Sequence, residues 1–181
     1  MTNLSYGKLR EQLVQAAHLL YQAGVMSHSG HGNMSVRLPE ADRMLLTSTG
    51  HITHLKPEQL AVVTYDGEVV EGIMDPAARE IIGMHSCIYR ARNDAHAVIH
   101  THSPRVTSFA LAHAPLPCVY EAFLRFGITD DIPWLIGRRV GRGSPSRILW
   151  SSLKSIRRFP RCCWQITGCW LSALIRSPPR N

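Results

Sequence analysis

Helical and extended hydrophobic patterns alternate over the first 133 residues of the chain. Helical spacing predicts a helix over 6–23 that ends at Gly24, from the apolar residues Leu9, Leu13, Ala16, Ala17 and Leu20. Short apolar runs predict strands over 34–37 and 44–47, and a hairpin over 60–70 that turns at Asp66-Gly67. Helical spacing returns over 76–90 and 104–112, on either side of a strand over 97–103. Mixed strands and helices with hairpins indicate an α/β or α+β sandwich rather than a regular βαβ repeat.

The strand over 97–103 carries two histidines. Because side chains alternate along a strand, His100 and His102 point to the same face. Two imidazoles at a strand end could bind a divalent metal such as Zn²⁺. The same pattern would arise from two partly buried histidines that are each satisfied by a hydrogen bond, so the pair alone leaves both interpretations open.

Two loops and one carboxylate accompany the histidine pair. Gly32-Asn33 and Thr49-Gly50 offer backbone N–H groups at sharp turns and could bind an anion, although ordinary turn chemistry explains many such pairs. Glu80 is the one carboxylate on the helix that precedes the histidine strand. It could serve as a general acid/base beside a metal, or it could be a solvated helix residue.

Composition limits the class of protein and divides the chain at residue 133. A chain of 181 residues suits one domain, and it has neither an apolar run of bilayer length nor a signal-peptide pattern at its start, so we expect a soluble, cytoplasmic protein without a membrane partner. Residues 1–133 contain 10 Lys+Arg and 13 Asp+Glu (net −3), whereas 134–181 contain 10 Lys+Arg and no acid (net +10). The basic tail lacks the lysine clusters and aromatic spacing of nucleic-acid-binding modules, which argues against a nucleic-acid partner.

Five motifs, in this order, resemble the class II aldolase/adducin family over about residues 7–133. They are Gly32 to Arg37, Leu46 to Gly50, Asp66 to Gly72, Met84-His85 with Ile88-Tyr89, and Ala97 to Ser103. The resemblance implies a three-layer α/β/α sandwich around a central, largely antiparallel sheet, in a homotetramer with sites between subunits. It also implies a Zn²⁺ ion held by His100, His102 and a third histidine further along the chain.

The resemblance implies a zinc-dependent aldehyde-lyase that cleaves a ketose phosphate or a related sugar acid by a retro-aldol reaction. Glu80 would then move the proton, and the partner would be a small-molecule sugar phosphate or sugar acid. A sugar-phosphate epimerase or a 3-oxo-acid decarboxylase could use the same fold and the same enediolate. A non-catalytic, adducin-like interaction module is the third alternative, against which the retained histidine pair argues.

The chain departs from the family pattern before Glu80. The family's Pro-Ser-Ser is replaced by Pro76-Ala77-Ala78, so the hydroxyl groups that would help to bind phosphate are missing. We expect Arg79 to take over as the anion partner, because a guanidinium can bind an oxyanion with two hydrogen bonds. Glu80 also lies one position further from His85 than the family pattern implies.

The third histidine is missing, because no histidine follows His113. The family places it in an Asn-His-Gly segment. Back-translated and read one base earlier, the stretch from Cys162 to Gln165 is forced to encode Leu-Leu-Ala, and 165–167 can encode Asn-His-Gly. We therefore interpret 1–133 as an incomplete domain of this family and 134–181 as an aberrant basic tail, read out of frame after Pro133. We expect this tail to have no packed structure continuous with 1–133, and the chain to be inactive or nearly so.

Overall fold

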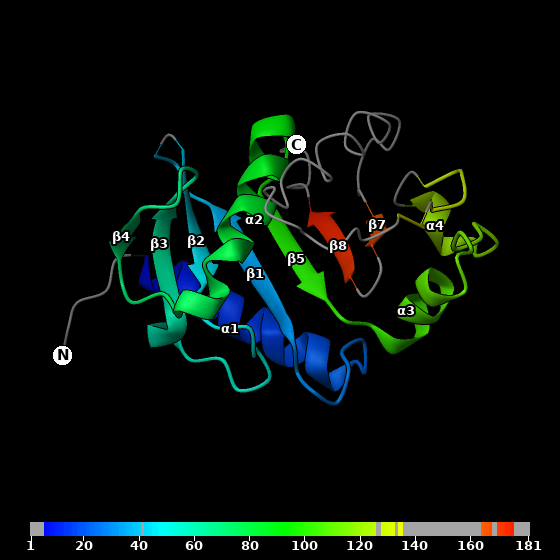
Figure 1. Cartoon of the computed structure of the whole chain (residues 1–181), viewed down its shortest axis with the longest axis horizontal. Coiled ribbons are helices and arrows are strands. Elements are labelled where there is room, and N and C mark those ends of the chain that lie inside the picture. Colours follow the sequence, from blue (N-terminus) through cyan, green and yellow to red (C-terminus); the bar gives the residue numbers. More distant parts are fainter. Residues whose placement is uncertain are drawn as a thin grey trace.

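One mixed sheet organises the molecule (Figure 1). The computed structural model describes residues 6–40, 42–125, 128–132, 134–135, 164–167 and 170–175. Within these residues the sheet has eight strands in the order β4-β3-β2-β1-β5-β8-β7-β6. The strands are β1 (Gly32–Arg37), β2 (Arg43–Thr47), β3 (Leu60–Thr64), β4 (Val69–Glu71), β5 (Ala97–Thr101), β6 (Trp134–Leu135), β7 (Trp164–Thr167) and β8 (Trp170–Ile175). All neighbours are antiparallel except β6 and β7, which are parallel.

Helices cover both faces of the sheet. They are α1 (Gly7–Gln22), α2 (Glu80–Ala91), α3 (Pro104–Leu111) and α4 (Ala122–Arg125), with 3₁₀ turns at η1 (Pro57–Gln59) and η2 (Pro76–Ala78). Side chains of β2 alternate between the two layers: Met44 and Leu46 pack in the cluster that contains α2, and Leu45 packs in the cluster that contains α1. The predicted α/β sandwich, with its largely antiparallel sheet, is confirmed.

The α1 layer is fixed by a buried arginine. Arg10 is 1% exposed, and its Nη1 donates to the carbonyl oxygens of Pro57 (2.9 Å) and Leu60 (2.6 Å). Its Nη2 pairs with Glu71 Oε1 at 2.6 Å. One guanidinium therefore joins α1 to η1, β3 and β4, and its charge is compensated where it is buried.

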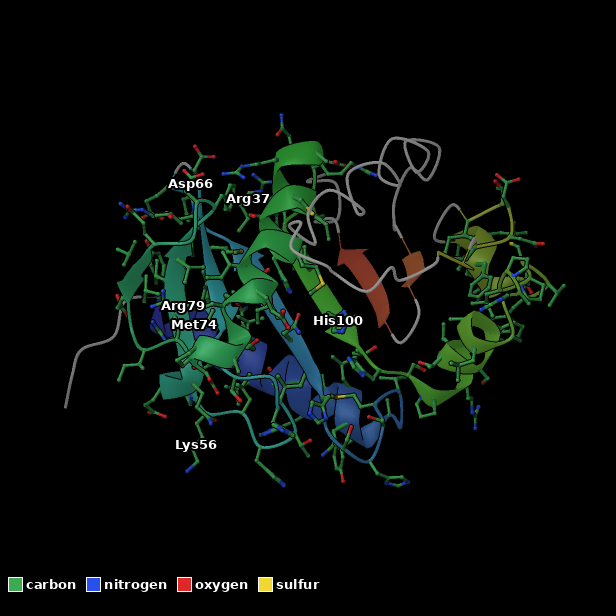
Figure 2. All side chains as sticks on the ribbon, in the orientation of Figure 1. Arg37, Lys56, Asp66, Met74, Arg79 and His100 are labelled. Carbon is green, nitrogen blue, oxygen red and sulfur yellow. The ribbon has the colours of Figure 1, made fainter. Side chains whose placement is uncertain are left out.

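A second arginine fastens the C-terminal end of α2 to β1. Arg37 donates from Nε to the Ala95 carbonyl (2.8 Å) and from Nη2 to the carbonyls of Tyr89 (2.7 Å) and Arg92 (2.9 Å). Its guanidinium also lies 4.8 Å from the centre of the Tyr89 ring, which stacks on Tyr65 at 5.6 Å. Figure 2 shows Arg37 at the end of the sheet opposite His100.

The tail differs from the sequence expectation in one respect. Backbone segments from 134–135, 164–167 and 170–175 are strands of the same sheet, and β8 pairs with β5 over five residues, with Ser172 opposite His100. The backbone of these strands therefore does continue the sheet of 1–133, whereas the absence of a packed domain in 134–181 stays a prediction. Backbone hydrogen bonds hold a strand in a ladder whatever its side chains are, which is why composition alone did not reveal them.

The predicted helices need one revision. The periodicity over 76–90 spans two elements, because the chain makes the 3₁₀ turn η2 before α2 begins at Glu80. Asp75 is the N-cap residue of η2, and its Oδ1 accepts a hydrogen bond from the Ala77 backbone N–H at 2.9 Å. Among the described residues no helix is long and apolar enough to cross a membrane.

Candidate active site

The pairing of β1 with β5 brings together residues that are far apart in the sequence. Asn33 lies directly opposite His100, and Gly32 lies opposite Thr101. Paired residues of antiparallel strands share a face, and here that face is covered by α2. Asn33 (3% exposed) and His100 (0% exposed) are both buried between the sheet and the helix.

The two candidate metal histidines lie at the end of β5. The ring centres of His100 and His102 are 5.1 Å apart, with an angle of 80° between the ring planes. Burial, reinforced by the neighbouring rings of His102 and His85, holds the pKa of His100 well below its usual value. Burial and His31 also lower the pKa of the half-buried His102. Both rings are therefore neutral near pH 7, the state in which imidazole binds a metal.

The two predicted anion loops lie side by side. Gly32 N donates to the Gly50 carbonyl at 3.0 Å, and Ile52 N donates to the Gly30 carbonyl at 3.1 Å. Gly30 has φ of +66°, and a Cβ there would lie 1.9 Å from Thr53 Oγ1. A side chain at Gly30 would be strained by this φ and would require Thr53 to move. The loops over 30–33 and 49–53 therefore meet along their backbones.

The start of α2 approaches the same loops. The Asp75 backbone N–H donates to the Ser48 carbonyl at 3.1 Å, which ties η2 to the end of β2. Glu80 is the first residue of α2, directly after η2. Its side chain is exposed, and no cation neutralises it in an ion pair among the described residues.

These elements enclose a pocket of about 380 Å³. Six of the residues singled out from the sequence line it: Gly32, Asn33, Thr49, Gly50, Glu80 and His102. His100 is not among the lining residues and is fully buried.

Arg79 is the predicted residue that the structure leaves outside the pocket. Its side chain is exposed, and it does not belong to the pocket lining. Figure 2 shows it beside Met74, away from His100. The chain changes from 3₁₀ to α-helix at this residue, and the next residue, Glu80, is the one that reaches the pocket. The expectation that Arg79 replaces the missing hydroxyls as anion partner is therefore not supported by its position.

Sequence reasoning missed several residues around the pocket. His31 and His51 line it, with ring centres 4.1 Å apart, and Asp75 lines it beside Ala77 and Ala78. His31 also lies 6.1 Å from the ring centre of His102. The sequence signal was the position of each histidine beside a loop glycine, His31 before Gly32 and His51 after Gly50.

A buried histidine behind Asn33 was also missed as a site residue. His85 is 0% exposed, and its Nε2 lies 2.6 Å from Asn33 Oδ1 and its Nδ1 2.7 Å from Ser35 Oγ. Burial lowers the pKa of His85 to about 3, so the ring is neutral. A neutral imidazole donates with one nitrogen and accepts with the other, which both partners here allow.

The described residues do not complete a zinc site. Within them, no group of three or more histidine, cysteine, aspartate or glutamate side chains is arranged to hold a metal ion. Catalytic zinc sites use three protein ligands and keep one open position. His100 and His102 have the right chemistry, but two donors leave the set one short.

Comparison with known proteins identifies the family. The model of the class II aldolase and adducin N-terminal domain matches residues 11–149. The chain is 39% identical over 95 residues to the L-fuculose phosphate aldolase of Methanocaldococcus jannaschii, covering 52% of this chain and 49% of that protein. It is 33% identical over 113 residues to the 5-deoxy-D-ribulose 1-phosphate aldolase of Bacillus thuringiensis serovar kurstaki, covering 62% and 52%. It is 35% identical over 103 residues to a 3-oxo-tetronate 4-phosphate decarboxylase of Escherichia coli O6:H1, covering 56% and 46%.

The fold agrees with this assignment. A solved structure of an L-fuculose 1-phosphate aldolase superposes with a TM-score of 0.75 at 19% identity, covering 98% of this chain and 80% of that one. The chain spans about half the length of the curated relatives it matches. The motifs, the sheet and the family match all agree: the chain belongs to the class II aldolase/adducin family.

Proposed function

We propose that the pocket binds the anionic end of a small sugar phosphate or sugar acid. The observation that carries the proposal is the convergence of Gly32, Asn33, Thr49 and Gly50 on one pocket with Glu80 and His102. The Gly32 N–H is already bonded to the Gly50 carbonyl, so the donors for a phosphate or carboxylate group are the side chains of Asn33 and Thr49 and the backbone of the loop at 49–50. The named activities of the relatives, which are aldolases and a decarboxylase of sugar phosphates, support the same class of ligand.

We propose retro-aldol cleavage of a ketose phosphate as the reaction for which this site is built. The exposed Glu80 carboxylate lies at the pocket wall across from the loops, where it could accept and return a proton of the bound substrate. Zinc is the metal that His100 and His102 would help to hold, and a third ligand is needed from outside the described residues. Because that set is incomplete, we expect little or no lyase activity from the chain with this sequence.

The frame change after Pro133 remains our explanation for the missing ligand. The break in charge at 133 and the Asn-His-Gly permitted in the adjacent frame at 165–167 support it. In the sheet, Ile166 of β7 pairs with Leu171 of β8, which in turn pairs with Thr101. With one base inserted after the Pro133 codon, the histidine of Asn-His-Gly would stand at position 167, next to Ile166 in β7 and opposite Trp170 of β8. The family match covers residues 11–149 and does not locate the break, so the nucleotide sequence decides where the frame changes.

Binding and metal content test the proposal on the chain with this sequence. Isothermal titration with inorganic phosphate should give a measurable affinity, and Asn33→Asp should abolish it by placing a carboxylate against the anion. Zinc content after purification should be well below one ion per chain. No phosphate binding by the unaltered protein would overturn the assignment of the pocket, and one tightly bound zinc per chain would overturn the incomplete metal site.

Restoring the frame tests the reaction. The nucleotide sequence from the Pro133 codon onward should contain Asn-His-Gly in the shifted frame, and the restored protein should bind one zinc and form a homotetramer. It should cleave a ketose phosphate, and Glu80→Gln should reduce turnover while zinc remains bound. Unchanged turnover would remove Glu80 from the mechanism.

Decarboxylation of a 3-oxo sugar acid is the second candidate, because a relative with that name matches about as well as the aldolases. Assays of the restored protein against ketose phosphates and 3-oxo acids distinguish the two reactions. Release of an aldehyde identifies the aldolase, and release of carbon dioxide identifies the decarboxylase. A restored protein that binds zinc but turns over neither class would favour an epimerase, which is assayed by interconversion of pentulose phosphates.

A further inference from the structure

A continuous line of buried hydrogen bonds leads from Asn33 into the layer between the sheet and α2. Asn33 Oδ1 lies 2.6 Å from His85 Nε2, and His85 Nδ1 lies 2.7 Å from Ser35 Oγ. Ser35 Oγ lies 2.7 Å from the hydroxyl oxygen of Tyr89. All four residues are at most 3% exposed, so water does not compete for these bonds.

Only one arrangement of the hydroxyl, imidazole and amide protons gives every donor in this line an acceptor. The buried hydroxyl of Tyr89 needs an acceptor for its proton, and among the described residues the structure gives it only Ser35 Oγ. Ser35 then donates to His85 Nδ1, and the neutral His85 ring donates from Nε2 to Asn33 Oδ1. The amide oxygen of Asn33 is thereby occupied, and its Nδ2 protons are left for the pocket that Asn33 lines.

We propose that Tyr89, Ser35 and His85 form a positioning relay that holds Asn33 with its N–H donors toward the pocket, where they bind an oxyanion of the substrate. This proposal rests on the proposed function for its ligand, a phosphate or carboxylate group. It adds the residues that decide whether Asn33 presents its N–H donors or its oxygen to the pocket. His85 is a positioning residue, since it acts through Asn33 and does not line the pocket.

The reverse arrangement shows why the relay matters. If Asn33 turned its amide over, its oxygen would face the pocket and repel an anion. His85 would then carry its proton on Nδ1 and donate to Ser35, and Ser35 would donate to Tyr89, whose own proton would be left buried without an acceptor. The penalty for one unsatisfied buried donor corresponds to a population preference of about 5- to 150-fold for the forward arrangement.

Ser35→Ala removes this preference. Without the hydroxyl, the Nδ1 atom of His85 has no partner in either arrangement, so the two tautomers and the two amide orientations approach equal populations. The apparent affinity for an anion is divided by the fraction of protein in the competent arrangement, and an equal mixture raises the Kd about twofold. Saturating anion should in turn return His85 to the Nε2–H tautomer, because binding selects the competent arrangement.

Nuclear magnetic resonance of the ¹⁵N-labelled chain tests the relay directly. Long-range ¹H–¹⁵N spectra show which ring nitrogen carries the proton, and in the unaltered protein we expect Nε2–H for His85, with or without inorganic phosphate. In Ser35→Ala we expect a mixture that phosphate converts to Nε2–H, with a phosphate Kd that rises in inverse proportion to the Nε2–H fraction. The matched control is Tyr65→Phe, because the buried Tyr65 hydroxyl has no hydrogen-bond partner within the described part of the chain and its ring stacks on Tyr89. This variant should leave the His85 tautomer and the phosphate Kd unchanged.

The outcomes separate the relay from the proposed function. An Nδ1–H tautomer for His85 in the unaltered protein overturns the relay, and this result needs no variant to fold. A Ser35→Ala protein whose tautomer is mixed but insensitive to phosphate, or whose Kd matches that of Tyr65→Phe, overturns the link between the relay and anion binding. Nε2–H in a protein that binds no phosphate at all overturns the proposed function and leaves the orientation of Asn33 established.

Discussion

Replacing Gly32 with alanine tests how closely β1 approaches β5 beside the candidate site. A Cβ at Gly32 would lie 2.7 Å from the His100 carbonyl oxygen and 3.2 Å from Ile52 Cδ1. Real Cβ atoms essentially never come within 3.0 Å of another heavy atom, so β1 must move by at least three tenths of an ångström. The obstructing atom belongs to the backbone of β5, which is held between β1 and β8, and a rotamer change cannot relieve the contact.

The expected cost is that of overpacking, about 1–3 kcal/mol. For a chain of this size each kcal/mol lowers the melting temperature by about 2–4 °C, so Gly32→Ala should melt roughly 2–12 °C below the unaltered protein. Gly50→Ala is the matched control, because it changes the facing loop of the same pocket and its Cβ would have nothing within 4 Å. Both substitutions stiffen the unfolded chain similarly, by about 0.4–1 kcal/mol, so the difference between them isolates the clash.

Urea unfolding followed by far-ultraviolet circular dichroism measures this difference. Gly32→Ala should have the lower midpoint, with an unchanged slope against urea concentration if the denatured state is unaffected. Equal midpoints for the two variants would mean that β1 and β5 do not approach as described.

Three further predictions concern buried polar groups. Arg10→Met should lower the free energy of unfolding by about 3–5 kcal/mol in chemical denaturation, because it removes the buried guanidinium that binds the Glu71 carboxylate and two carbonyls; an unchanged midpoint would contradict this. The pKa of His85 is about 3 in the folded chain and near 6.5 when unfolded, so as the pH falls from 6.5 toward 3 the unfolded state binds the proton preferentially. Stability should then fall by about 1.4 kcal/mol per pH unit from this residue, and His85→Gln should flatten the profile by that amount. Burial raises the pKa of Cys87 to about 12, so iodoacetamide should label Cys118 before Cys87 in the native protein, as peptide mapping would show; equal rates would refute the packing of α2.

Local periodicity was sufficient to predict most elements of the sandwich. The strand over 97–103 is β5 with the residues that follow it, and the helix over 6–23 is α1. Both patterns lie within one element, where apolar spacing reflects a single buried face. The hairpin over 60–70 was found for the same reason, since its turn and both strands are contiguous in the chain.

The polar residues that build the site could not be predicted in the same way. Ser35 and His85 are 50 residues apart in sequence, and only the packing of α2 on β1 brings them within hydrogen-bond distance. Arg10 falls on an otherwise apolar helix face, and its burial depends on carbonyls 47 and 50 residues away. Arg79 and Glu80 were both assigned to the site, but the change from 3₁₀ to α-helix between them puts only Glu80 at the pocket.

Arg37 holds the C-terminal end of α2, so a change in the tilt of the helix at that end displaces the residue at its N-terminal end. The twelve residues from Glu80 to Ala91 form a helix about 17 Å long. Arg37 binds the carbonyl oxygens of Tyr89 and Arg92 at one end, and the Glu80 carboxylate lies at the other. A tilt of about 3° at the fastened end would displace Glu80 by about 0.9 Å, given the helical rise of about 1.5 Å per residue. For the proton transfer proposed for Glu80, a misplacement of about 1 Å can cost about 100-fold in rate. The position of the Glu80 carboxylate therefore depends on how Arg37 holds the other end of α2, at the end of the sheet opposite His100 in Figure 2.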